Sequence, residues 1–165
     1  MPMTKDDLLA HLDRLGIAHS TVSHPPLRTV ADSQALRGEL AGGHTKNLFL
    51  RDRKNRHFLV TVGEDAVVDL KTIHTLIGAS GRVSFGREGD LMALLGVAPG
   101  AVTLFGVVND RDHAVTAVLD AGLMEHATIN AHPLTNEATT QVAARDAIAF
   151  MEATGHPPLI LKVSA

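Results

Sequence analysis

The chain has no cysteine, tryptophan or tyrosine, and it contains only five phenylalanines. The absence of cysteine excludes a disulfide framework, a thiol nucleophile and a cysteine-based zinc site. It is also typical of cytosolic proteins, so we expect a cytoplasmic location. Apolar residues make up 45% of the sequence. The core must therefore be built mainly from leucine, valine, isoleucine and alanine.

Long hydrophobic runs and a strong basic charge are also missing. No apolar run approaches the ~18 residues of a membrane span, and residues 1–7 carry acids instead of the apolar core of a signal peptide. The formal net charge is -3. This charge argues against electrostatic binding of a long nucleic-acid duplex, but it permits contact with the end of a tRNA. We therefore expect neither a membrane nor DNA as a partner.

Periodicity and turn residues predict one domain over 1–165, in which helices are interspersed among short strands. The clearest helix follows a capping pattern of Thr4 and Asp7 and ends at Gly16. A hairpin is expected around the basic turn R-D-R-K-N-R, residues 51–56, so the sheet should be mixed with antiparallel pairs. Further helices are expected over 29–40, 68–77, 91–95 and 143–153, and further strands over 17–23, 83–85, 139–142 and 159–163, with three more between 101 and 129.

Ten histidines invite a metal site, but their spacing does not support one. No pair has the two-histidine helical spacing of metalloproteases, and His126 and His132 lack an obvious third ligand. A G-x-S-x-G nucleophile elbow is absent. Residues 42–46 resemble only part of the phosphate-binding loop motif. We therefore expect no metal and no cofactor.

Three separated segments contain the remaining candidates for functional residues. They are T-K-N-L-F-L at 45–50, G-A-V-T-L-F-G at 100–106 and H-P-L-T-N at 132–136. Lys46 enters an apolar strand at its start, where it is either a snorkelling surface residue or a functional cation. A glycine-flanked loop can point backbone N–H groups at a developing oxyanion, or it can be a tight turn before an apolar strand. His132 is either a hydrogen-bonded structural residue or a substrate contact.

Together these segments resemble the YbaK/prolyl-tRNA-synthetase editing-domain family of aminoacyl-tRNA deacylases. The resemblance runs from about residue 8 to residue 161 and includes T-K-N-L-F-L-R-D, G-V-A-P-G-A-V-T-L-F-G, H-P-L-T-N-E-A-T-T and F-M-E-A-T-G-H-P-P-L-I. It implies a mixed α/β (α+β) fold with a largely antiparallel, barrel-like sheet and surrounding helices. The order and spacing look most like the free-standing branch that clears alanine from proline tRNA.

The resemblance implies a hydrolase that frees alanine from mischarged alanyl-tRNA(Pro), with prolyl-tRNA synthetase as a possible partner. Lys46 would hold the terminal phosphate or stabilise charge near the ester. Asn47 and His132 would contact the substrate. The loop would offer backbone N–H groups of Gly100, Ala101, Val102 and Thr103 to the ester carbonyl.

The basic turn and one departure from the family pattern leave alternatives open. Arg51, Arg53 and Lys54 form either a solvated turn or a phosphate-facing rim beside Lys46. Leu104 stands where the family loop usually has proline, which affects loop rigidity. A deacylase for cysteinyl- or seryl-tRNA is one alternative function. A non-catalytic module that binds tRNA ends is another.

Overall fold

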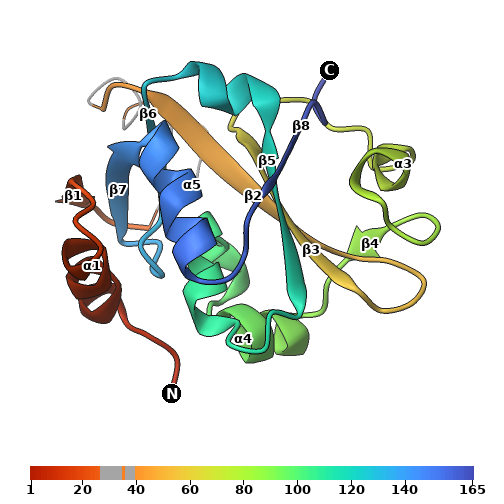
Figure 1. The fold of residues 1–165 in the computed structure, drawn as a ribbon, viewed down its shortest axis with the longest axis horizontal. Coiled ribbons are helices and arrows are strands. Elements are labelled where there is room, and N and C mark those ends of the chain that lie inside the picture. Colours follow the sequence, from red (N-terminus) through yellow and green to blue (C-terminus); the bar gives the residue numbers. More distant parts are fainter. Residues whose placement is uncertain (27–34, 36–39) are drawn as a thin grey trace.

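A computed structural model describes residues 1–26, 35 and 40–165 (Figure 1). The helix expected over 29–40 lies outside these described residues. The described α-helices are α1 (Lys5–Arg14), α3 (Ile73–Ile77), α4 (Glu88–Leu95) and α5 (Ala144–Ala153), and the 3-10 helices are η1 (Pro99–Ala101), η2 (Leu104–Asn109) and η3 (Ala121–Glu125). The strands are β1 (His19–Ser23), β2 (Gly43–Arg51), β3 (His57–Gly63), β4 (Ser84–Phe85), β5 (Val115–Asp120), β6 (Thr128–Ala131), β7 (Ala138–Ala143) and β8 (Leu159–Leu161).

The strands form one mixed sheet in the order β1-β7-β6-β2-β3-β5-β8, with β4 paired to β2 outside this path. Four ladders are antiparallel and three are parallel, so the mixed, mainly antiparallel sheet predicted from the sequence is confirmed. The long strand β2 belongs to both halves of the sheet. It pairs with β6 at its first residues and with β3 along the rest of its length (Figure 1).

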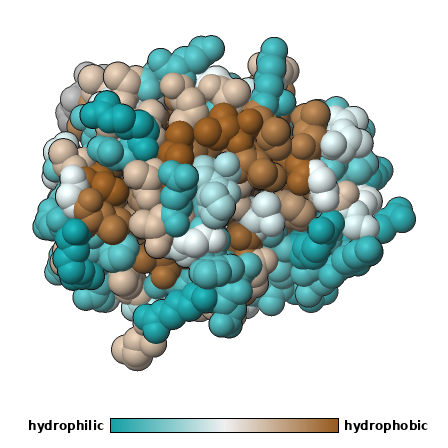
Figure 2. All heavy atoms as spheres, viewed as in Figure 1, coloured by the Kyte–Doolittle hydropathy of each residue, from teal (hydrophilic) through white to brown (hydrophobic). Residues whose placement is uncertain are grey.

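Two apolar clusters fill the two sides of the sheet. The larger one packs α1, α4 and α5 against residues such as Phe49, Leu59 and Ile129. The smaller one packs α3 against Leu50 and other side chains of the opposite face. Strand β3 contributes to both clusters and is buried along almost its whole length, as expected for a central strand covered on both sides. Figure 2 shows apolar surface where the edge strand β8 crosses this face of the molecule.

The helix start is confirmed in atomic detail. Thr4 accepts a hydrogen bond from the Asp7 backbone N–H, and the Asp7 carboxylate accepts one from the Thr4 N–H. The hairpin at 51–56 and the helices at 91–95 and 143–153 are also confirmed, with shifts of a few residues at their ends. No described helix has the length and apolarity needed to cross a bilayer.

Two predictions of local structure are wrong. The helix expected over 68–77 shrinks to α3, because the Asp69 side chain accepts the Lys71 backbone N–H and organises a turn first. The first of the three strands expected between 101 and 129 is instead 3-10 helix, since the Thr103 hydroxyl caps the Phe105 N–H at the start of η2. A short buried apolar run does not distinguish strand from helix by its pattern alone.

Candidate active site

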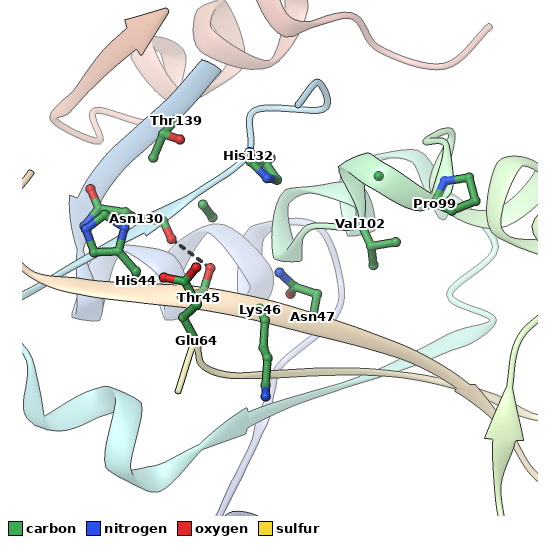
Figure 3. Close-up of a pocket in the computed structure, with 12 residues that line it drawn as sticks. His44, Thr45, Lys46, Asn47, Glu64, Pro99, Val102, Asn130, His132 and Thr139 are labelled. Carbon is green, nitrogen blue, oxygen red and sulfur yellow. Dashed lines mark hydrogen bonds between the residues drawn. The ribbon is translucent and has the colours of Figure 1, made fainter. Parts of the chain in front are cut away.

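A polar cavity of about 250 Å³ opens between β2, the β6–β7 hairpin and the turn that carries η1 (Figure 3). We call it the central cavity. It is lined by His44, Thr45, Lys46, Asn47, Glu64, Pro99, Gly100, Val102, Asn130, Ala131, His132 and Thr139. The structure thus brings together all three segments that the sequence singled out, although they lie far apart along the chain.

Strand β2 presents alternate side chains to opposite faces of the sheet. Thr45 and Asn47 face the cavity (Figure 3). The Thr45 hydroxyl donates to the Asn130 carbonyl at 2.7 Å. The Asn47 side-chain oxygen accepts from the Thr61 hydroxyl at 2.5 Å, which fixes the orientation of the amide. Asn47 is therefore a positioned donor at the cavity wall.

Lys46 lies between these two residues, and its side chain extends away from the other side chains that line the cavity (Figure 3). Its ammonium donates to the Ala66 carbonyl at 2.6 Å. The alternation of β2 explains this direction, because Leu48 and Leu50 point to the same side and pack in the smaller cluster with Ala66. The ammonium is therefore held beside the cavity by the neutral Ala66 carbonyl.

The loop at 100–103 contributes fewer groups to the cavity than the sequence suggested. Gly100 and Val102 line it, whereas Ala101 is packed in the larger apolar cluster and Thr103 is buried. The Ala101 N–H donates to the Ala98 carbonyl at 2.9 Å, and the Thr103 hydroxyl serves as the cap of η2. The Ala101 donor is already used within the protein. An incoming carbonyl would therefore meet the N–H groups of the neighbouring loop residues.

Leu104, in the position of the family's proline, is the first residue of η2. A helix leaves the N–H of its first residue without an intrahelical partner, so the backbone would accept proline there. The leucine side chain is fully buried among the apolar residues of the larger cluster. Core packing therefore fixes this end of the loop in place of a proline ring.

His132 is held in a defined tautomer. Its Nδ1 lies 3.0 Å from the Ala138 carbonyl, which can only accept, so Nδ1 carries the proton and the Nε2 lone pair is available. Burial lowers the pKa of His132 below its usual range, and the nearby His24 adds to this, while the Ala138 hydrogen bond and Glu64 act in the opposite direction. His132 is therefore neutral at pH 7 and can accept a hydrogen bond in the cavity.

Sequence reasoning missed the polar residues that support these groups. Asn130 is 2% exposed, and its amide nitrogen donates to the carbonyls of Ala41 and Gly43 at 2.9 and 3.3 Å. His24 Nε2 lies 2.8 Å from the Thr139 hydroxyl, and the His24 ring is 6.4 Å from the His132 ring. These residues could have been found from the sequence because they are polar residues inside strands that are otherwise apolar. A buried polar side chain needs a hydrogen-bond partner.

The basic turn lies at the other end of β2. Arg51 lies five positions after Lys46, which is ~16 Å along a strand. Asp52 organises the turn by accepting from the N–H groups of Lys54 and Arg56 and from the Arg56 guanidinium. Although burial opposes it, these bonds and one from the Ser80 N–H lower the pKa of Asp52 to about 2. The structure therefore does not place Arg51, Arg53 or Lys54 beside the central cavity.

Comparison with known proteins identifies the family of the chain. Residues 24–150 match the family model described as the aminoacyl-tRNA editing domain. The chain belongs to this family. The family, together with the relatives named as editing proteins, makes the chain an aminoacyl-tRNA deacylase, which is a hydrolase.

Individual relatives of this editing domain match it over nearly their whole length. The chain is 35% identical to the prolyl-tRNA editing protein ProX of Acetoanaerobium sticklandii, covering 92% of this chain and 93% of that protein. It is 37% identical to the prolyl-tRNA synthetase associated domain-containing protein 1 of Danio rerio, covering 95% and 86%. A solved structure described as a putative trans-editing enzyme for prolyl tRNA synthetase has the same fold, with a TM-score of 0.71, 21% identity and coverage of 98% and 99%.

Prolonged chelation is expected to leave the rate of deacylation unchanged. Within residues 1–26, 35 and 40–165, no three histidine or acidic side chains are grouped as metal ligands. The measurement is the hydrolysis rate before and after dialysis against EDTA. A loss of activity that zinc restores would contradict the prediction.

Proposed function

We propose that this editing domain hydrolyses mischarged alanyl-tRNA(Pro) to alanine and free tRNA. The observation that carries the proposal is the small central cavity, where the loop at Gly100, the fixed amide of Asn47 and the neutral His132 meet. The names of its curated relatives support proline tRNA as the carrier. Prolyl-tRNA synthetase is then the enzyme that supplies the mischarged substrate.

Size selection explains why such an activity is needed. A synthetase pocket built for proline gains only ~1–3 kcal/mol from the methylenes that alanine lacks, so it admits alanine at a low rate. A second site can hydrolyse the smaller residue and exclude the larger one. Val102 and Pro99 line one side of the central cavity, and Figure 3 shows the Val102 side chain directed towards β2. This wall would limit the size of the amino acid.

The proposed reaction needs no protein nucleophile, because the ester is already an activated acyl group. Water adds to the carbonyl carbon while loop N–H groups at Gly100 and Val102 stabilise the developing oxyanion. His132 Nε2 accepts a hydrogen bond from the attacking water. The ester C–O bond then breaks, the ribose oxygen takes up the proton that the attacking water has lost, and alanine and tRNA leave.

Lys46 and the basic turn complete the proposed substrate contacts. The Lys46 ammonium would exchange its neutral Ala66 partner for a phosphate of the tRNA end, since a hydrogen bond between two charged groups is stronger. Arg51, Arg53 and Lys54 would contact the tRNA backbone farther from the ester, at the distance set by β2.

Single-turnover deacylation of a panel of charged tRNAs tests the function. We expect fast release of alanine from alanyl-tRNA(Pro) and slow release of proline from prolyl-tRNA(Pro). Preferential hydrolysis of cysteinyl- or seryl-tRNA would keep the enzyme class but change the substrate. Binding of tRNA without hydrolysis of any ester would instead indicate a module that recognises tRNA ends.

The rate of deacylation should fall on acidification, with an apparent pKa below 6.5. Burial lowers the pKa of His132, so protonation occupies Nε2 only below the usual histidine range. The same shift makes the folded state lose stability as the pH falls below about 6.5, because the unfolded chain then binds more protons. The measurement is a pH–rate profile from pH 5 to 8, corrected for spontaneous hydrolysis.

A matched variant separates His132 from its titratable neighbours His24 and Glu64. Asparagine at position 132 retains a side-chain donor for the Ala138 carbonyl but does not titrate. His132→Asn should therefore be slower and lose the acidic limb of the profile. If the acidic limb of the pH–rate profile is unchanged in this variant, the limb must come from the titration of another group.

A further inference from the structure

The two threonine hydroxyls that line the central cavity donate their protons to other protein groups. The Thr45 hydroxyl donates to the Asn130 carbonyl at 2.7 Å, which is the dashed line in Figure 3. A hydroxyl has a single proton and two lone pairs, so an oxygen whose proton is already used can only accept further hydrogen bonds. Thr45 therefore offers the cavity an acceptor and not a donor. The same holds for Thr139, for a reason that involves a residue outside the cavity lining.

His24 fixes the direction of the Thr139 hydroxyl. His24 Nδ1 lies 2.8 Å from the Pro25 carbonyl, which can only accept, so Nδ1 carries the proton of the neutral ring. The Nε2 lone pair is then the acceptor for the Thr139 hydroxyl, 2.8 Å away. Thr139 is 5% exposed, and its oxygen is left with lone pairs only. A chain of two hydrogen bonds, which begins at a backbone carbonyl, thus makes Thr139 an acceptor at the cavity wall.

The charges at the cavity favour a cation. Among the described residues that line it, Glu64 is the only aspartate or glutamate. The Lys46 ammonium extends away from the other lining side chains and donates to Ala66 instead (Figure 3). The cavity therefore offers its ligand hydroxyl lone pairs and a carboxylate. Such a wall attracts a positively charged group that carries several N–H donors, because hydrogen bonds from a charged donor are the stronger ones.

We propose that Thr45 and Thr139 accept hydrogen bonds from the α-ammonium group of the aminoacyl ester, with Glu64 supplying the opposite charge. The inference rests on the proposed function, which places an aminoacyl ester in the central cavity. An ammonium group has three N–H donors and no lone pair, so it matches a wall of acceptors. His24 is a positioning residue, since it keeps the Thr139 oxygen in the accepting state. Selection for a free amino group is then added to selection by size, and peptidyl-tRNA, whose amino nitrogen is acylated, is spared.

Two substrates that differ only at the amino group test the proposal in single-turnover deacylation at sub-saturating enzyme. Propionyl-tRNA(Pro) lacks the α-ammonium of alanyl-tRNA(Pro) and keeps the methyl group. Thr139→Val keeps the branched shape and removes the hydroxyl. It should lower kcat/KM for the alanyl ester about 10- to 100-fold, as expected for the loss of a hydrogen bond to a charged group, and leave that for the propionyl ester unchanged. The comparison of four rates cancels the higher intrinsic reactivity of the alanyl ester.

Three further variants serve as controls. Thr139→Ser keeps the hydroxyl and should remain close to the wild type. His24→Phe keeps a ring but removes the acceptor for the Thr139 proton, so it should lower the preference for the alanyl ester in the same direction and by less. Thr116→Val alters an exposed threonine of β5, outside the cavity, and should change neither rate. An equal decrease for both esters with Thr139→Val would show a merely structural role and overturn the proposal, as would wild-type kinetics.

A binding measurement separates this proposal from the proposed function. The probes are two tRNA(Pro) molecules that carry alanine or propionate through an amide bond in place of the ester. The wild type should bind the alanine form about 10-fold or more tightly, and Thr139→Val should bind the two equally. That result would support the amino-group site even if the wild type hydrolysed no alanyl-tRNA(Pro), in which case the proposed function alone would fail. Equal affinity of the wild type for the two amides would overturn the proposal.

Discussion

Replacing Lys46 with alanine is expected to lower kcat/KM for alanyl-tRNA(Pro) by about 100-fold or more and to leave the fold intact. Among the described residues that line the central cavity, Lys46 is the only lysine or arginine. The variant loses the charged contact that we propose with a phosphate of the tRNA end, and removing one partner of such a pair costs about 2–5 kcal/mol, which corresponds to about 30- to 5,000-fold and includes the loss that we expect. The side chain is flexible, and its ammonium donates to the neutral Ala66 carbonyl. Single-turnover kinetics and thermal unfolding of the variant give the two readouts.

Two further variants show whether the charge or the contact with Ala66 matters. Lys46→Met keeps the apolar stem and removes the charge, so it should be as slow as Lys46→Ala. Lys46→Arg keeps the charge and should retain part of the activity. Lys71→Ala, which removes an exposed lysine before α3, is the control for a general loss of positive charge. Unchanged turnover in Lys46→Ala would mean that Lys46 has only a structural role, in which it holds the segment at Ala66.

Valine at position 100 is expected to reduce deacylation about 100-fold or more, without unfolding the protein. A Cβ at Gly100 would lie 3.2 Å from the Asn136 side-chain nitrogen, so alanine is accommodated after a small shift of that side chain. Valine adds two methyl groups to this Cβ, and we expect them to enter the cavity and keep the ester carbonyl away from the loop N–H groups. Losing such donors is worth about 10²- to 10³-fold. The measurement is single-turnover hydrolysis by Gly100→Ala and Gly100→Val.

Gly89→Val is the matched control for this prediction. Gly89 lies in α4, and a Cβ there would have no neighbour within 4 Å. Its replacement should therefore leave the rate of deacylation unchanged. Full activity of Gly100→Val would mean that the loop is only a structural turn and that the oxyanion donors lie elsewhere.

The elements governed by local chemistry could be predicted from the sequence. The capping box at Thr4 and the hairpin around residues 51–56 follow from neighbouring residues and are confirmed. The 3-10 helix η2 could not be predicted in this way, since its apolar residues would suit a strand equally well. The side-chain cap provided by Thr103 decided the outcome.

Only part of the site could be predicted from the sequence. The resemblance to a family indicated which segments meet, but the side to which Lys46 points follows from the alternation of β2 and could have been read from Leu48 and Leu50. The support given by Asn130 depends on the register between β6 and β2. Such a register joins residues far apart in the sequence, so no local pattern contains it.

The strand β2 also acts as a molecular ruler. Thr45 and Asn47 line the central cavity at one end of the strand, and the basic turn follows its other end at Arg51. One rigid segment of ~16 Å, from Lys46 to Arg51, thus sets the spacing between the cavity and the turn. A ligand that reaches both must carry its amino acid and a phosphate group at this separation. A free amino-acid ester reaches only the cavity, so we expect the domain to distinguish a charged tRNA from such an ester by length.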